Sequence, residues 1–324
     1  MCDSESECWK GRLDEYSEGY LVMNMPCYTT CKKLKLGKDG FPPVFAQLPP
    51  PFSEKIDAWA WNTFDWLQYR KERTDYFFSG DQVITYTLWP WERQDRRVQM
   101  QAMKISEHPV WKDLPAPFNQ KIDAISWNGG RFGDMRYYIF SGDQVIEYTL
   151  WDNYHKKTRV MRRPCKIAEH ELFKDLPPPF NQKIDAITQS GVRGRTRIEW
   201  IVSGDQVVEY LMYSPPRAGG GRLHSQPSSI VANPVFDELP PPFSQKIDAF
   251  GWNGNQGQLR IDYIYSGGHV LEYKLGEFAL KKTALQNGKR LQGEAVKLGA
   301  LPIVSKAGNQ NAVTVVPMEH MERD

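Results

Sequence analysis

Apolar and polar residues alternate along several short stretches of the chain, and glycine, proline or aspartate bounds each stretch. Alternation with a period of two is typical of a β-strand that buries one face. The pattern predicts strands at 121–127 (KIDAISW), 137–140 (YYIF), 145–150 (VIEYTL) and 159–167 (RVMRRPCKI). Ser-Gly-Asp-Gln joins the second strand to the third, and its glycine and aspartate suit a tight hairpin turn. These stretches predict one antiparallel unit of four strands.

The same unit occurs four times along the chain. Its opening motif reads LPPPFSEKIDAWAWN, LPAPFNQKIDAISWN, LPPPFNQKIDAITQS and LPPPFSQKIDAFGWN, and a hairpin motif such as FFSGDQVITY follows each copy. The motif aspartates are 66, 62 and 63 residues apart: Asp57, Asp123, Asp185 and Asp248. A repeated unit of this size cannot bury its apolar face alone, so neighbouring units must pack together. The proline-rich LPPPF cannot continue a strand ladder, so we expect it to connect the outer strand of one unit to the inner strand of the next.

Four such units in a radial arrangement make an all-β fold, a four-bladed β-propeller with N- and C-terminal extensions. We expect the propeller at 44–276, with blades at about 44–107, 108–171, 172–235 and 236–276, and the extensions at 1–43 and 277–324. Two closures of the ring are open. The outermost strand of the last blade comes either from Lys33–Gly37 or from Glu294–Leu298.

The residues IDA, followed about twenty positions later by an aromatic strand, a Gly-Asp turn and a tyrosine, resemble the hemopexin-like repeat. The resemblance covers the four units, roughly 70% of the chain. It implies a narrow axial channel in which the backbone carbonyls of Asp57, Asp123, Asp185 and Asp248 bind a structural Ca²⁺ or Na⁺. A simpler role is also open, in which the aspartate side chains only hydrogen-bond neighbouring backbone.

Charge and composition narrow the function classes. The net charge is +2 at pH 7, so no global field favours nucleic acid, and no apolar stretch is long enough to predict a membrane span. The acidic, polar N-terminus is unlike a secretory signal, and an odd number of cysteines, five, favours reduced thiols; we therefore expect a cytoplasmic location. The chain has no HExxH, phosphate-binding loop, GxSxG or Cys/His cluster, so we expect no catalytic cofactor.

Differences between the copies point to function, because what all copies share serves the fold. The third copy has Gln189 where the others have tryptophan, the fourth has His269 where the others have glutamine, and the first has a longer basic loop at 63–75. The loops that follow the inner strands leave from one end and gather at one mouth of the channel, together with Trp59, Trp61, Trp66, Trp127 and Trp252. The alternative roles are packing between blades for these tryptophans, a solvated rim for the loop arginines and a surface position for His269.

Two functional interpretations remain open. The chain is similar in general build to fungal hemopexin-fold hetero-Diels–Alderases, which implies an intracellular pericyclase that joins a tropolone-type quinone methide to a terpene alkene, with small hydrophobic polyketide or terpene substrates. In that case the tryptophans and His269 bind substrate, and the donors to the heterodiene oxygen are Gln189, Asn128, Arg193 and Arg260. The alternative is a non-enzymatic hemopexin-like module that binds heme, another small ligand or a protein. We expect neither nucleic acid nor membrane as a partner.

Overall fold

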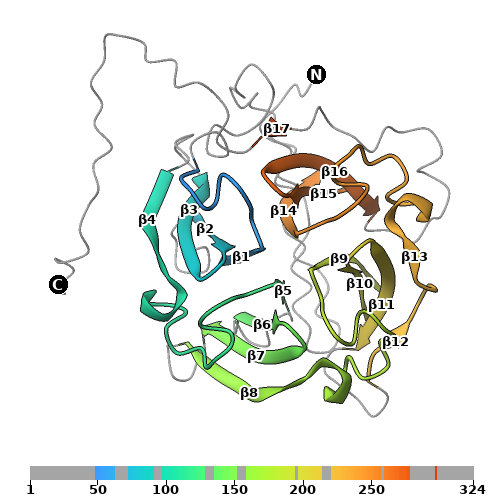
Figure 1. Cartoon of the computed structure of the whole chain (residues 1–324), viewed down its shortest axis with the longest axis horizontal. Coiled ribbons are helices and arrows are strands. Elements are labelled where there is room, and N and C mark those ends of the chain that lie inside the picture. Colours follow the sequence, from blue (N-terminus) through green and yellow to red (C-terminus); the bar gives the residue numbers. More distant parts are fainter. Residues whose placement is uncertain are drawn as a thin grey trace, which may run out of the picture.

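Four antiparallel sheets stand around a common axis in the computed structural model, as the blades of a propeller (Figure 1). The predicted all-β, four-bladed fold is confirmed. The structure describes residues 48–62, 72–90, 97–127, 135–151, 158–193, 196–213, 220–256, 259–277 and 296–297. In this part of the chain the only helices are 3-10 turns of three residues, and none is long enough to cross a bilayer.

Each blade follows the chain outward from the axis (Figure 1). Blade 1 is β1 (Ala58–Asn62), β2 (Glu72–Ser79), β3 (Gln82–Pro90) and β4 (Arg97–Lys104). Blade 2 is β5 (Ala124–Trp127), β6 (Met135–Ser141), β7 (Gln144–Trp151) and β8 (Arg159–Lys166). Blade 3 is β9 (Ala186–Arg193), β10 (Thr196–Ser203) and β11 (Gln206–Tyr213), with β12 (Arg222–Leu223) and β13 (Ser228–Ser229) both paired to β11. Blade 4 is β14 (Ala249–Gln256), β15 (Leu259–Ser266), β16 (His269–Glu277) and β17 (Val296–Lys297).

The strands predicted in the second copy agree with β5 to β8 to within three residues at each end. Three 3-10 turns, η1 (Ile105–Glu107), η2 (Ile167–Glu169) and η3 (Ile230–Ala232), follow the outer strands. The proline-rich segments then lead back to the axis, as expected, with cis peptide bonds before Pro51, Pro117, Pro179 and Pro242.

A two-residue turn, Gly-Asp in blades 1 to 3 and Gly-Gly in blade 4, joins the second and third strands of each blade. Gly80, Gly142, Gly204 and Gly267 adopt positive φ values between 52° and 60°, which L side chains disfavour. The amide of each glycine donates to Oδ2 of the aspartate in its own blade, at 2.8 Å for Asp57 and at 2.7 Å for the other three. The aspartate side chains therefore tie the start of each inner strand to its hairpin turn, and a cation on their backbone carbonyls stays a prediction.

The last strand of blade 4 comes from the C-terminal side of the chain. Val296 and Lys297 of β17 pair with Val270 and His269 of β16. Lys33–Gly37, the other candidate for this position, lies outside the described residues.

The core is divided among the junctions between blades rather than centred on the axis. One aromatic residue after the outer strand of each of blades 1 to 3 inserts between two blades, and we call Trp111, Phe173 and Phe236 the junction aromatics. Phe173 packs edge-on against Tyr138 and Phe140 of blade 2 and stacks on Tyr210 of blade 3. All three junction aromatics are fully buried. Their burial supplies much of the hydrophobic stabilisation that holds neighbouring blades together.

Candidate functional site at the tryptophan end of the channel

Four residues occupy equivalent places, each as the fourth residue of an inner strand. Trp61 pairs across strands with Asp75, Trp127 with Tyr137, Gln189 with Glu199 and Trp252 with Asp262. The shared register shows that Gln189 takes the position of a fourth tryptophan. We call this set, Trp61, Trp127, Gln189 and Trp252, the tryptophan end.

The three tryptophans of this set lie against one another. The ring centroids of Trp61 and Trp127 are 5.9 Å apart, and those of Trp61 and Trp252 are 5.3 Å apart. Trp61, in the middle, is buried, whereas Trp127, Trp252 and Gln189 keep part of their surface exposed. Blades 4, 1 and 2 thus contribute a continuous aromatic surface, and blade 3 interrupts it with an amide. The tilted ring contacts stabilise this arrangement beyond the area that they bury.

Trp59 serves packing between blades, which is the simpler of the two roles considered for the tryptophans. Its side chain is 7% exposed and belongs to a hydrophobic cluster formed by residues of blades 4, 1 and 2. It faces Gly251 of blade 4, where an added Cβ would lie 3.4 Å from Trp59 Cδ2. The corresponding residues of the other blades, Ile125, Ile187 and Phe250, are likewise buried.

Side chains of the second strands hold the tryptophan end from behind. Tyr137 of blade 2 donates its hydroxyl to the carbonyl of Trp61 in blade 1, and Arg197 of blade 3 donates to the carbonyl of Trp127 in blade 2. Each bond links a blade to the one before it. The backbone that carries two of the tryptophans is therefore fixed by the neighbouring blade, so the aromatic surface is preorganised.

Arg197 also forms a buried ion pair directly behind Gln189. Its Nη2 lies 2.8 Å from Oε1 of Glu199, the cross-strand neighbour of Gln189, and 3.2 Å from Oγ of Ser126 in blade 2. Arg197 and Glu199 are 6% and 1% exposed. A buried ion pair of this kind requires its hydrogen-bond partners, because breaking one side would leave an uncompensated charge. Neither residue is among the predicted site residues, although their spacing of two on one strand places both side chains on one face.

The other predicted site residues are only partly placed. Arg193 and Arg260 lie at the tryptophan-end halves of β9 and β15, but their side chains are outside the description, as are Trp66 and Asn128 altogether. His269 is the first residue of β16, directly after the Gly-Asp-type turn. This turn lies at the aspartate end of the blade, so the structure does not bring His269 together with the tryptophans.

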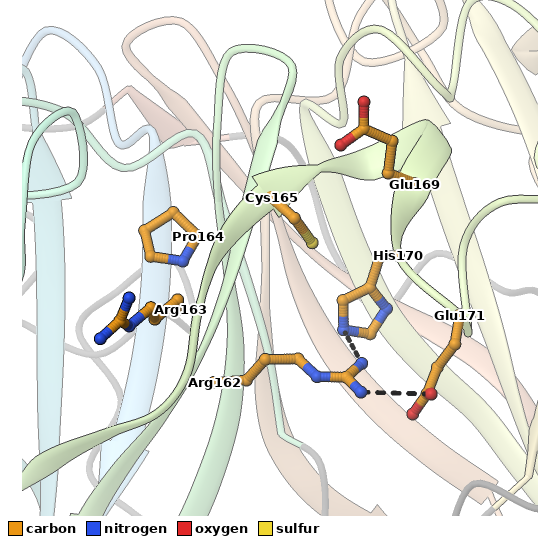
Figure 2. A pocket seen from close by; sticks show the side chains of 7 residues that line it. All are labelled: Arg162, Arg163, Pro164, Cys165, Glu169, His170 and Glu171. Carbon is orange, nitrogen blue, oxygen red and sulfur yellow. Dashed lines mark hydrogen bonds and ion pairs between the residues drawn. The ribbon is translucent and has the colours of Figure 1, made fainter.

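A separate pocket of ≈ 380 Å³ lies on the outer strand of blade 2 (Figure 2). Its arginine is already paired: Arg162 Nη2 is 3.2 Å from Glu171 Oε2, and Nη1 is 3.4 Å from His170 Nε2. Burial, with a smaller effect of Arg162, lowers the pKa of His170 to about 4, and burial raises the pKa of the Cys165 thiol. At pH 7 the histidine is neutral and the thiol is protonated, so this pocket has neither a thiolate nucleophile nor a charged histidine. We therefore place the candidate site at the tryptophan end.

Within the described ranges, no three His, Cys, Asp or Glu side chains gather closely enough to form a metal site. The carboxylates of Asp57, Asp123, Asp185 and Asp248 each accept from a glycine amide and lie close to a lysine. A channel cation would therefore rely on backbone carbonyls, as the family resemblance implies.

Comparison with known proteins finds weak structural similarity only. No family model and no curated protein matches the sequence. Among solved structures, the Nup133 β-propeller domain of Vanderwaltozyma polyspora is 11% identical, with a TM-score of 0.26 over 70% of this chain and 63% of that one. The Chaetomium thermophilum Polycomb Repressive Complex 2 bound to GSK126 is 9% identical, with a TM-score of 0.31 over 76% and 59%. The chain thus covers less than two thirds of either structure, and the hemopexin-like resemblance rests on the repeated motif.

Proposed function

We propose that the tryptophan end binds an apolar, unsaturated small molecule and holds it for a cofactor-independent hetero-Diels–Alder cycloaddition. The observation that carries this proposal is the replacement of a fourth tryptophan by Gln189 in an otherwise aromatic set. An aromatic surface with one polar group is the composition expected of a small-molecule site.

The chemistry of the site follows from its few polar atoms. The Gln189 amide can donate to a carbonyl oxygen of a heterodiene, which gains electron density in the transition state. The indole Nε1 of Trp127 is buried and has no acceptor among the described residues, so it would become a second donor if a bound ligand displaced the groups that cover it. The remaining rate acceleration comes from holding diene and alkene at reacting distance, since such positioning lowers the activation barrier by up to roughly 7–11 kcal/mol.

The arrangement behind the site supports this role. Tyr137 and Arg197 fix the carbonyls of Trp61 and Trp127, and the ion pair of Arg197 with Glu199 braces the strand next to Gln189. Donors that are fixed before the substrate binds need no reorganisation during the reaction, which is the main source of electrostatic catalysis.

The test is chiral LC–MS of the purified protein with a tropolone quinone-methide precursor and a humulene-type alkene. We expect a rate above buffer with one enantiomer in excess. Gln189→Trp, which completes the aromatic set, should abolish the excess, and Gln189→Ala should lower the rate by roughly 10²-fold, the effect of losing one such donor. Gln182→Ala, a glutamine of the same blade at the opposite end, is the matched control and should behave like the wild type.

Ligand binding is measured in parallel by quenching of tryptophan fluorescence with the alkene alone. Saturable quenching without a rate would support the non-enzymatic binding module and remove the catalytic part of the proposal. If the protein showed neither fluorescence quenching nor a rate above buffer, the proposed site itself would be overturned. A Soret band on titration with hemin that Gln189→Trp leaves intact would place a heme-binding function elsewhere in the molecule.

A further inference from the structure

The opposite mouth of the channel carries one lysine per blade. Each lysine stands two residues before the motif aspartate, and we call Lys55, Lys121, Lys183 and Lys246 the lysine ring. The distance from Nζ to the aspartate Oδ1 of the same blade is 2.9 Å for Lys121, 2.6 Å for Lys183 and 2.7 Å for Lys246, and Lys55 is in contact with Asp57.

Each lysine of the ring stands three residues before an inner strand, so the four surround the channel axis. Lys55 Nζ lies 3.6 Å from Oδ1 of Asp248, so it reaches from blade 1 to blade 4. Burial pulls the pKa of Lys183 down, but its hydrogen bond to Asp185 and the attraction of Asp185 and Asp123 outweigh this and raise the pKa. Repulsion from Lys55, on the opposite blade, has the smallest effect and opposes this rise.

Positive and negative charges lie at different depths in this ring. The aspartate side chains are at most 10% exposed, and each already accepts a glycine amide. The lysine side chains are 39–47% exposed, and an ammonium has three N–H donors. The buried aspartates thus orient the lysine side chains, while N–H donors of the ammonium groups remain on the solvent side. Other acids at this end, Glu54 and the turn residues Asp81, Asp143 and Asp205, are less closely involved because no ion pair joins any of them to the ring.

We propose that the lysine ring binds one tetrahedral oxyanion on the channel axis, either free inorganic phosphate or the phosphate of a phosphomonoester. Four ammonium donors that surround an axis match an acceptor with oxygens on several sides, and hydrogen bonds between charged partners are the strong ones. Lysine acts as a point charge toward phosphate, so the ring needs no fixed fork geometry. The same ammonium groups oppose the entry of a cation at this mouth.

The test is isothermal titration calorimetry of the full chain with inorganic phosphate in low-salt, chloride-free buffer. We expect binding at a ratio of one, weakened about tenfold by each of Lys121→Gln, Lys183→Gln and Lys246→Gln, since glutamine keeps a donor to the aspartate but removes the charge. Lys112→Gln, an exposed lysine on the connection between blades 1 and 2, should bind like the wild type. Near-equal losses in the three ring variants are the signature of a shared axial site.

A second measurement tests the proposal even if a glutamine variant of the ring fails to fold. Lys183→Arg retains the charge and should retain broadening of the phosphorus-31 signal of phosphate. If glycerol phosphate binds more tightly than inorganic phosphate, the ligand of the ring is a phosphomonoester. If the two bind equally, the ligand is free inorganic phosphate. Absence of phosphate binding by the wild type, or ring variants that bind like the wild type, would overturn the proposal. Gln189→Trp should leave phosphate binding unchanged, which separates this site from the proposed function.

Discussion

Three equivalent positions in successive repeats are held by His108, His170 and Asn233. Together they show that the repeat requires a hydrogen-bond acceptor atom there rather than one residue type. Nδ1 of His108 accepts from the amide of Val110 at 3.1 Å, and Oδ1 of Asn233 accepts from the amide of Val235 at 2.9 Å. The ring proton of His108 is then on Nε2, 3.0 Å from Thr85 Oγ1. Each side chain satisfies an amide two residues later, and all three are buried.

This arrangement predicts an acid-sensitive fold. Burial lowers the pKa of His108 and His170 from 6.5 to about 4, so the unfolded chain takes up their protons first. Their contribution is fully present above pH 6.5 and is lost as the pH falls through about 4, by at most roughly 3 kcal/mol for each histidine. The double variant His108→Asn/His170→Asn should lose much less stability between pH 7.5 and 4.5 than the wild type, as measured by urea unfolding. His224→Asn, at a half-exposed position, is the control and should follow the wild-type pH dependence.

Sequence alone identified some residues of the candidate sites and not others. Gln189 is visible because one copy departs from three, and its register confirms the equivalence. The lysine ring escapes this comparison because all four copies are identical there, and identity suggests a role in the fold. Glu199 escapes it because Ser126, which donates to its carboxylate, belongs to another blade, and only the closed ring brings that blade near.

At the scale of elements, the strands and turns follow from local pattern, whereas the junctions between blades do not. Alternation and the Gly-Asp turns place β6, β7 and β8 almost residue for residue. Phe173 stands in a connection after η2, and nothing in its local pattern distinguishes it from a surface loop residue. Only packing reveals it as a junction aromatic with contacts to blades 2 and 3.

The junction aromatics should therefore be the most sensitive positions outside the strands. Phe173→Ala should destabilise the fold by about 3–5 kcal/mol, because a fully buried ring leaves a cavity between two blades. Phe173→Leu fills most of the space and should cost about 1–1.5 kcal/mol. Denaturant unfolding of the purified variants measures both. An alanine variant within 1 kcal/mol of the wild type would show that the blades do not depend on this contact.

At the scale of the whole molecule, the outer edge of blade 4 has a short pairing. Among the described residues, only His269 and Val270 of β16 pair with β17, whereas β3 and β7 pair with outer strands of eight residues. The sequence alone does not decide which terminal segment supplies the outermost strand of blade 4, since both contain a suitable strand. Two-residue pairing is also too short for periodicity to reveal.

Truncation tests how much the closing strand contributes. A chain that ends at Gly293 lacks β17 and should melt several degrees below the full chain, because the outer edge of β16 loses its partner. A chain that ends at Leu298 keeps β17 and should melt like the full chain. Equal melting of the two truncated chains would assign closure to another segment.

The inner strands lead from the lysine ring at one end to the tryptophan end at the other, and this direction has a consequence for how the molecule can change. Six residues separate Lys55 from Trp61, which at about 3.3 Å per residue is about 20 Å, more than a small ligand spans. A substitution early in the motif alters one mouth of the channel, and a substitution late in it alters the other. Selection or engineering can therefore tune the two mouths independently on one unchanged set of strands.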